Sequence, residues 1–263
     1  MDFLHQINPL YVGSGFAVGF LVGLTGVGGG SLMTPILILL FGVHPASAVG
    51  TDLLYASATK TGGSLVHNLH RTIDWKLVGR LALGSLPAAL LTLLALSALG
   101  ADTKALNALM SRALAVALVL TALSLAFRAA IGRIYAARVG KLDAKLTHRL
   151  TIVTGAVLGA LVTISSVGAG ALGVTALVLL YPEMKMARIV GSDIAHAVPL
   201  TLVAGAGHLL MGHINYEMLA TLLLGSLPGI AIASHLAPRL PEVAMRYALS
   251  GVLLLVSGRL LLA

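Results

Sequence analysis

Three stretches of this chain carry no charged residue and are long enough to cross a bilayer: Leu81–Ala98, Ala113–Phe127 and Met218–Ala233. Of the 263 residues, 58% are apolar and only 10% are charged, against about 25% charged in soluble domains. No soluble core could bury that much apolar surface, so the sequence predicts an all-α polytopic membrane protein surrounded by membrane lipids. This class excludes a soluble enzyme and a nucleic-acid-binding module, and no nucleic acid partner is expected.

Ten apolar segments follow one another along the chain, and their hydrophobic pattern predicts helices. Two in each half are too short or too rich in glycine for an ordinary crossing, so we expect eight to ten segments with short or broken helices near the midplane. The predicted segments are Leu10–Leu24, Ser31–Gly42, Thr51–His67, Trp75–Leu99, Leu106–Ala130, His148–Thr163, Val167–Tyr181, Ser192–Leu210, Tyr216–Leu236 and Val243–Leu262.

The two halves of the chain repeat each other. The tetrad Gly84–Pro87 (GSLP) returns identically as Gly225–Pro228, and the triad Gly50–Asp52 (GTD) returns in the same register as Gly191–Asp193 (GSD). We expect the tetrads, which begin at Gly84 and Gly225, to lie at close helix contacts. We therefore expect residues 1–130 to form a first transmembrane repeat, residues 131–147 a cytoplasmic linker and residues 148–263 a second transmembrane repeat.

The location of the basic residues predicts the orientation in the membrane better than the net charge of +8 does. If the N-terminus is outside, 13 of the 17 Lys and Arg residues fall in or beside inside loops, so the positive-inside rule places both termini in the periplasm. Each repeat then has an odd number of crossings and the two are inverted, as in many secondary transporters. The thirteen residues are Arg71, Lys76, Arg80, Arg128, Arg133, Arg138, Lys141, Lys145, Arg149, Lys185, Arg188, Arg239 and Arg246.

A glycine run, Gly26–Ser31 (GVGGGS), separates the first two segments. Successive backbone N–H groups of such a run can face one concavity and bind an oxyanion, which makes its last four residues candidate substrate ligands. Close helix packing explains the same glycines equally well. The counterpart Ser165–Gly170 (SSVGAG) has fewer glycines but offers hydroxyls, of which Ser166 is a candidate ligand. The four candidates in the first run are Gly28, Gly29, Gly30 and Ser31.

Two aspartates, Asp52 and Asp193, stand at the starts of predicted segments in the repeated triads. Helix capping is the slightly favoured reading, and a proton-coupling carboxylate at membrane depth is the alternative. Of the two, we expect Asp52 to be the more sensitive to replacement. The hydroxyls beside them, Thr51 and Ser192, are candidate substrate ligands.

Lys60, His67 and His208 lie inside or near the ends of long apolar segments. Asp52, Lys60 and His67 share one helical stripe, so they can face one cavity, where a cation attracts an anion and a histidine takes up a proton. Lys60 could instead snorkel or pair with a carboxylate, and both histidines could be interfacial residues bonded to backbone. No spacing of His, Asp and Glu resembles a metal site, so neither a metal nor another cofactor is expected.

The chain resembles the TauE/SafE sulfite exporter family, also called the 4-toluenesulfonate uptake permease family, over nearly its whole length. The residues that carry the resemblance are Gly23–Pro35 (GLTGVGGGSLMTP), Ala48–Thr51 (AVGT), Ile73–Trp75 (IDW) and Val190–Pro199 (VGSDIAHAVP). One departure is Ser165–Gly170, where many members repeat the glycine run.

The resemblance implies a secondary transporter of small sulfur-containing anions, such as sulfite or organosulfonates, in the bacterial inner membrane. It also implies that an ion or proton gradient drives the transport and that the protein is not an enzyme. A passive anion channel is the first alternative, and a membrane scaffold or enzyme without flux is the second. The assembly state stays open, with a homodimer as one option.

Overall fold

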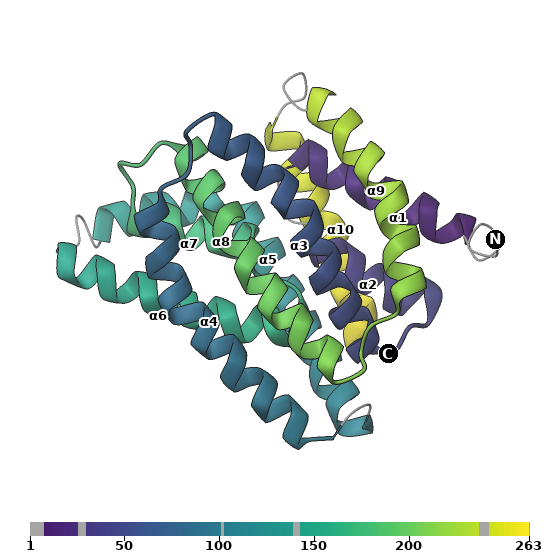
Figure 1. The fold of residues 1–263 in the computed structure, drawn as a ribbon. Coiled ribbons are helices and arrows are strands. Elements are labelled where there is room, and N and C mark those ends of the chain that lie inside the picture. The colour runs from purple at the N-terminus through teal and green to yellow at the C-terminus, as the bar shows by residue number, and fades with distance from the viewer. Residues whose placement is uncertain (1–7, 26–29, 101–102, 139–142, 237–241, 263) are drawn as a thin grey trace.

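The computed structural model describes residues 8–25, 30–100, 103–138, 143–236 and 242–262, and all regular secondary structure in these residues is helical. Each predicted segment coincides with one helix, so the all-α expectation is confirmed. In chain order the helices are α1 (Pro9–Thr25), α2 (Gly30–Phe41), α3 (Pro45–Leu69), α4 (Trp75–Ala98), α5 (Lys104–Arg138), α6 (Ala144–Ser165), α7 (Ala171–Leu180), α8 (Met186–Leu210), α9 (Tyr216–Leu236) and α10 (Glu242–Leu262) (Figure 1).

Several helix ends follow directly from local sequence. Pro45 lies in the first turn of α3, where its missing N–H costs nothing. The Asp74 carboxylate caps α4 by accepting hydrogen bonds from the backbone N–H groups of Lys76 and Leu77, both at 3.1 Å. Asp143 caps α6 in the same way.

Two predicted helix starts are corrected by the structure, and two helices extend into the expected linker. Helix α5 continues to Arg138 and α6 begins at Ala144, so residues 131–138 and 144–147 of the expected linker 131–147 are helical. Helices α3 and α8 begin at Pro45 and Met186, earlier than the predicted Thr51 and Ser192.

The earlier helix starts overturn the capping interpretation of the two aspartates. Asp52 and Asp193 lie in the interiors of α3 and α8, and both side chains are buried. His44 and Lys185 occupy the N-cap positions instead, and neither makes a side-chain capping hydrogen bond.

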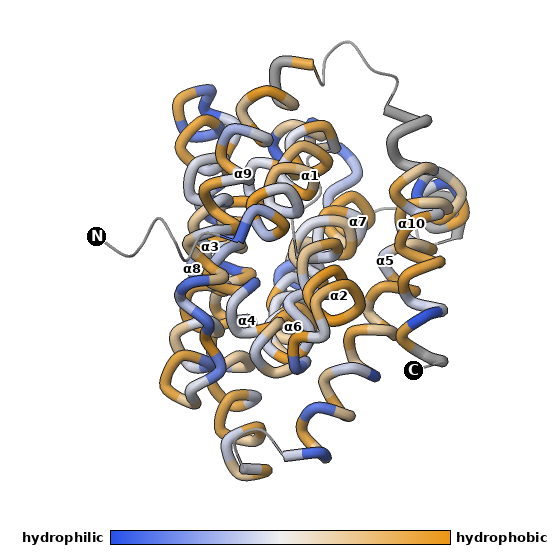
Figure 2. Tube along the Cα trace, turned by 90° about the vertical axis from the view of Figure 1, so that its right-hand side faces the viewer, coloured by the Kyte–Doolittle hydropathy of each residue, from blue (hydrophilic) through white to orange (hydrophobic). Residues whose placement is uncertain are grey.

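Five helices in the described part of the chain are long and apolar enough to cross a membrane, namely α4, the first part of α5, α6, α8 and α9. Hydrophobic residues dominate most helices (Figure 2), and large apolar side chains such as Leu91, Leu210 and Leu255 are exposed on the outside of the bundle. Such a surface suits lipid rather than water. The fold is that of a multi-span membrane protein.

Helices α3 and α8 pack side by side through the middle of the bundle (Figure 1). On either side α1 packs against α9 and α4 against α6, and α5 packs against α10. Glycines allow the close approach: a Cβ added at Gly84 would collide with the Ile152 carbonyl oxygen, and one at Gly225 with the Val12 carbonyl oxygen. The expected helix contacts at the repeated tetrads are thereby confirmed.

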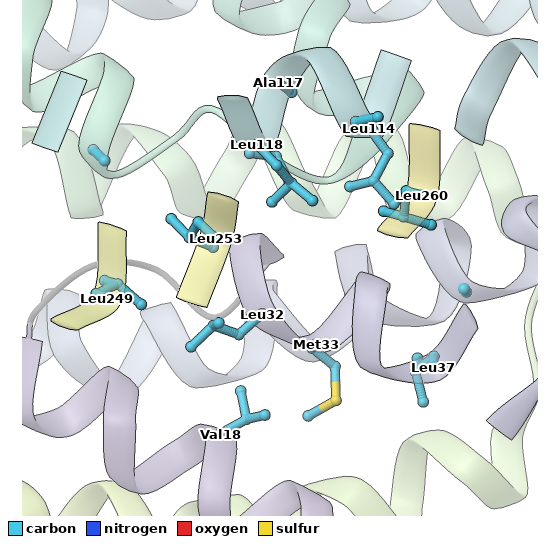
Figure 3. Packing of buried hydrophobic residues seen from close by; sticks show 14 of the residues in the cluster. Val18, Leu32, Met33, Leu37, Leu114, Ala117, Leu118, Leu249, Leu253 and Leu260 are labelled. Carbon is cyan, nitrogen blue, oxygen red and sulfur yellow. The ribbon is translucent and has the colours of Figure 1, made fainter. Parts of the chain in front are cut away.

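The short helix α2 is enclosed by longer ones. Its residues Leu32, Met33 and Leu37 are buried against α1, α5 and α10, as the labelled side chains of Figure 3 show. This packing holds the beginning of α2 inside the bundle, next to α3.

Candidate functional site

Lys60, two turns after Asp52 in α3, is a buried cation of the interior. Its side chain is 9% exposed, and its Nζ atom donates a hydrogen bond to the backbone carbonyl oxygen of Ala169 at 2.9 Å. Lys60 also interacts electrostatically with Asp52 and Asp193. The ammonium group is therefore held inward between groups from both halves of the chain and does not snorkel to an interface.

Asp52 lies beside hydroxyl groups from the first turns of α2 and from the C-terminal end of α6. The Thr34 hydroxyl, in the first turns of α2, donates a hydrogen bond to Asp52 Oδ2. Ser166, at the end of α6, lies beside the same carboxylate. Asp52 thus connects α3 to the start of α2 and to the α6–α7 break.

Asp193 occupies the matching place on α8 and has fewer partners. Lys60 and Arg128 are its charged neighbours, and the Gly170 N–H lies close by. A Cβ added at Gly173 would collide with the Asp193 carboxylate. Glycine at this position therefore lets α7 approach α8 while leaving room for the carboxylate.

The chain leaves helical geometry between α6 and α7, next to this cluster. Ser166, Gly168 and Gly170 have φ angles of 59°, 134° and 133°, values that L side chains rarely adopt and that glycine tolerates. Irregular backbone survives inside a membrane only where protein or water satisfies its polar groups. The Lys60 ammonium supplies one such partner, at the Ala169 carbonyl.

Several buried polar atoms at this place make no hydrogen bond within the described residues: Asp52 Oδ1, both carboxylate oxygens of Asp193, Ser166 Oγ and His196 Nδ1. Buried polar groups in native proteins nearly always have a partner, so such a group of unsatisfied atoms indicates a place for water, a proton or a ligand. The cluster is the strongest candidate for a binding site in the described part of the chain.

The charges of the cluster balance when all four ionisable groups are charged. Asp52 and Asp193 are acids, and Lys60 and Arg128 are bases within electrostatic reach of Asp193. A bound anion would break this balance unless a proton neutralised one of the carboxylates. The arrangement can therefore link anion binding to proton binding.

Sequence reasoning missed three members of this neighbourhood. Arg128 was counted only among the basic residues in or beside inside loops, although Thr121, Ser124 and Arg128 form a polar stripe at helical spacing on α5. Thr34 lies within the family motif but was not singled out. His196 lies within the motif Val190–Pro199 but was not singled out, and it is fully buried one turn after Asp193.

His196 and Tyr55 occupy equivalent places in the two repeated segments. The His196 Nε2 atom lies 2.7 Å from the Ser85 hydroxyl on α4, and Tyr55, one turn after Asp52, lies beside Ser226 on α9. Both serines belong to the repeated Gly-Ser-Leu-Pro tetrads. The shared register of these residues was the signal that could have found them.

Two predicted substrate ligands bind loops instead of facing the cluster. The Thr51 hydroxyl accepts a hydrogen bond from the backbone N–H of Asn215 at 3.1 Å. The Ser192 hydroxyl accepts one from the backbone N–H of Asp74 at 2.8 Å. The Thr51 hydroxyl thereby connects α3 to the turn before α9, and the Ser192 hydroxyl connects α8 to the turn before α4.

The two histidines predicted as substrate ligands, His67 and His208, also make hydrogen-bond contacts at the ends of their helices. His67 Nδ1 lies 2.8 Å from the Thr72 hydroxyl. His208 is fully buried, with Nε2 2.9 Å from the Thr163 carbonyl oxygen and Nδ1 3.1 Å from His213 Nδ1. These contacts favour the interpretation of both histidines as bonded structural groups at the ends of α3 and α8.

The first glycine run is only partly described. Gly28 and Gly29 lie outside the described residues, Gly30 begins α2, and Ser31 is buried in its first turn. Ser31 therefore lies one turn before Thr34, whose hydroxyl contacts the Asp52 carboxylate.

A multi-span helical bundle with a charged cluster beside a helix break is the architecture of a membrane transporter. The chain belongs to the sulfite exporter TauE/SafE family, whose model matches residues 11–260. This is a family of transporters, not of enzymes.

Curated relatives bear the same description. The chain is 41% identical over 245 residues to the probable membrane transporter protein YjnA of Bacillus subtilis, covering 93% of this chain and 95% of that protein. It is 25% identical over 238 residues to YdhB, a probable membrane transporter protein of the same organism, covering 89% and 92%. No solved structure matches the chain significantly.

Proposed function

We propose that this protein is a secondary transporter that moves small sulfur-containing anions, such as sulfite or organosulfonates, across the bacterial inner membrane. The observation that carries the proposal is Lys60, a buried cation that lies between two buried carboxylates at a helix break. A desolvated ammonium attracts an anion strongly, because no water screens it. The family membership supports an anion as the substrate.

We propose that the coupling ion is a proton. A sodium ion would have to share the space between Asp52 and Asp193 with the Lys60 ammonium, at the expense of repulsion between like charges. A proton neutralises one carboxylate directly and converts it into a hydrogen-bond donor for the incoming anion. Binding one proton with each added negative charge keeps the buried cluster balanced.

The contacts between helices support an arrangement of two inverted repeats. The pair α1–α9 corresponds to the pair α6–α4. The Thr51–Asn215 and Ser192–Asp74 hydrogen bonds correspond in the same way. We propose repeats over residues 1–130 and 148–263, which meet at α3 and α8.

The charge distribution supports a topology with both termini in the periplasm. On this topology four basic residues at or beside helix ends face the cytoplasm: Arg71, Arg80, Lys145 and Arg188. The basic end of α5 and the start of α6 lie on the same side.

The direct test is flux through the purified protein in proteoliposomes. We expect uptake of radiolabelled sulfite or an organosulfonate to follow an imposed pH gradient, and to exceed the uptake by empty liposomes. Accelerated exchange against substrate loaded inside, without net proton movement, would separate a carrier from the alternative passive anion channel. Absence of flux for every anion tested would favour a scaffold.

A further inference from the structure

A second place suited to an anion lies away from the central cluster, where α4, α6, α7 and α8 come together at one end of the bundle. A cavity of about 470 Å³ opens there. Its lining includes the guanidinium-bearing residues Arg80 and Arg188, the Tyr181 side chain and the first turn of α6 at Ala144 and Thr147. On the proposed topology this end faces the cytoplasm.

The two arginines line the cavity, and each makes one side-chain hydrogen bond within the described residues. Arg80 Nη1 donates to the Tyr181 hydroxyl at 3.4 Å, and Arg188 Nη2 donates to Asp74 Oδ2 at 3.0 Å. A guanidinium has five N–H donors in a planar fork that matches an oxyanion. The Tyr181 hydroxyl is itself held 2.8 Å from Thr151 Oγ1, which fixes its position beside Arg80.

One acidic residue, Glu183, also lines the cavity, so the lining has two positive groups and one negative group. The N-terminal turns of α6 and α8 reach the cavity through Ala144, Thr147 and Arg188. Helix N-termini carry partial positive charge, which adds to the attraction for an anion.

The equivalent cavity at the other end of the bundle has different chemistry. It is lined by residues around the α2–α3 and α8–α9 turns, including His44, Asn215 and Glu217, and contains neither Lys nor Arg. The two ends of the protein are therefore chemically unlike, and only one of these two cavities is lined by guanidinium groups.

Helix α7 connects the basic cavity with the central cluster. Leu179 and Leu180, at its C-terminal end, line the cavity, while Gly173, near its start, approaches Asp193. A helix of 10 residues spans about 15 Å. An anion bound between Arg80 and Arg188 would thus lie one short helix away from Lys60.

We propose that Arg80 and Arg188 form a second oxyanion site, which collects the substrate anion at the face carrying this cavity before the anion reaches Lys60. This inference rests on the proposed transport function. Because the peripheral site lies on one face only, the two faces of the transporter differ in their apparent affinity for the anion.

Equilibrium binding tests the site independently of transport. The single tryptophan, Trp75, begins α4 five residues before Arg80 and can report binding by its fluorescence. In phosphatidylcholine nanodiscs, we expect sulfite to give a saturable response in the wild type and in Lys60→Met, which lacks the central cation. Arg80→Gln and Arg188→Gln should each raise the half-saturating concentration by about tenfold, the loss expected for a charged hydrogen bond.

Two further variants control this experiment. Lys185→Gln removes an exposed positive charge beside α8 that does not line the cavity, and it should bind like the wild type. Glu183→Gln removes the acidic group from the lining and should tighten binding. Absence of a saturable response in the wild type, or equal responses in all variants, would overturn the second site while leaving the flux test of the central site unaffected.

A soluble anion and a lipid headgroup both present oxyanions, so a further experiment must distinguish between them. Nanodiscs that contain phosphatidylglycerol should leave the sulfite response intact. Loss of the response only in these nanodiscs would assign the cavity to headgroup phosphate and overturn its role in collecting substrate.

Discussion

The Lys60 ammonium donates a hydrogen bond to the backbone carbonyl oxygen of Ala169, 2.9 Å away and 109 residues later in the chain. Ala169 belongs to the break between α6 and α7, so the buried cation of one half of the chain completes the broken helix of the other half. An anion that binds Lys60 must share or replace this bond. Substrate binding and the geometry of the α6–α7 break are therefore expected to depend on each other.

Removing the cation should impair anion binding. We predict that Lys60→Met lowers affinity for a sulfur oxyanion by about tenfold or more, because a charged hydrogen bond is lost. The KM of proteoliposome uptake measures the effect at the central cluster, with the exposed Lys104→Met as the control. Lys60→Met removes a positive charge from beside two buried carboxylates and could lower the yield of folded protein. The double variant Lys60→Met/Asp193→Asn removes one of these negative charges as well, and it is therefore measured alongside. A normal KM in a folded Lys60→Met protein would restrict the anion site of the central cluster to backbone amides and hydroxyls.

The two aspartates should respond differently to amide replacement. An asparagine at position 52 can still accept the Thr34 hydroxyl hydrogen bond, whereas the Asp193 oxygens have no such partner within the described residues. We therefore predict that Asp193→Asn abolishes pH-driven uptake but preserves substrate exchange, and that Asp52→Asn is milder. The sequence pattern alone favoured Asp52. Near-normal pH-driven uptake in both variants would exclude these carboxylates as proton carriers.

A close helix contact can be tested within α4. Gly84 faces the α6 backbone at Ile152, whereas Gly79 has open space at its Cβ position. Gly84→Ala should lower the free energy of unfolding by about 1–3 kcal/mol through overpacking, while Gly79→Ala should be neutral or slightly stabilising. Thermal unfolding in one detergent compares the two, and equal melting temperatures would contradict the close α4–α6 packing.

The hydroxyls of Thr51 and Ser192 should matter for stability rather than substrate affinity. Thr51→Val and Ser192→Ala each leave a backbone N–H without its acceptor, at Asn215 and Asp74 respectively. We expect each change to lower the free energy of unfolding by about 1–3 kcal/mol and to leave KM for uptake unchanged. A large rise in KM with unchanged melting temperature would restore these hydroxyls as substrate ligands.

The orientation in the membrane is open to a direct test. Alkaline phosphatase fused to either terminus should be active, because this reporter requires the periplasm. Green fluorescent protein fused to either terminus should not fluoresce, because it does not fold after export in unfolded form. A fusion within residues 131–147 should show the opposite pattern. A C-terminal fusion active in the cytoplasm would contradict both the orientation and the odd number of crossings in each repeat.

Hydropathy and internal repetition were sufficient to predict the helices and several of their contacts. Each of the ten predicted segments matches a helix, because a bilayer demands continuous apolar runs whose lengths can be read directly. The repeated tetrads at Gly84 and Gly225 correctly indicated close packing, since a missing side chain has the same steric consequence in any helix.

The composition of the site was decided by tertiary structure. The sequence placed Asp52 and Lys60 on one stripe of one helix. Helical spacing does not predict that they lie close to Asp193, Arg128 or the Ala169 carbonyl, which come from other parts of the chain. His67 shares that stripe and is nevertheless engaged by Thr72 at the far end of α3. Side-chain spacing determines which residues share a helical face. What that face meets depends on how α3, α5, α7 and α8 pack, and only the folded chain brings their charges together.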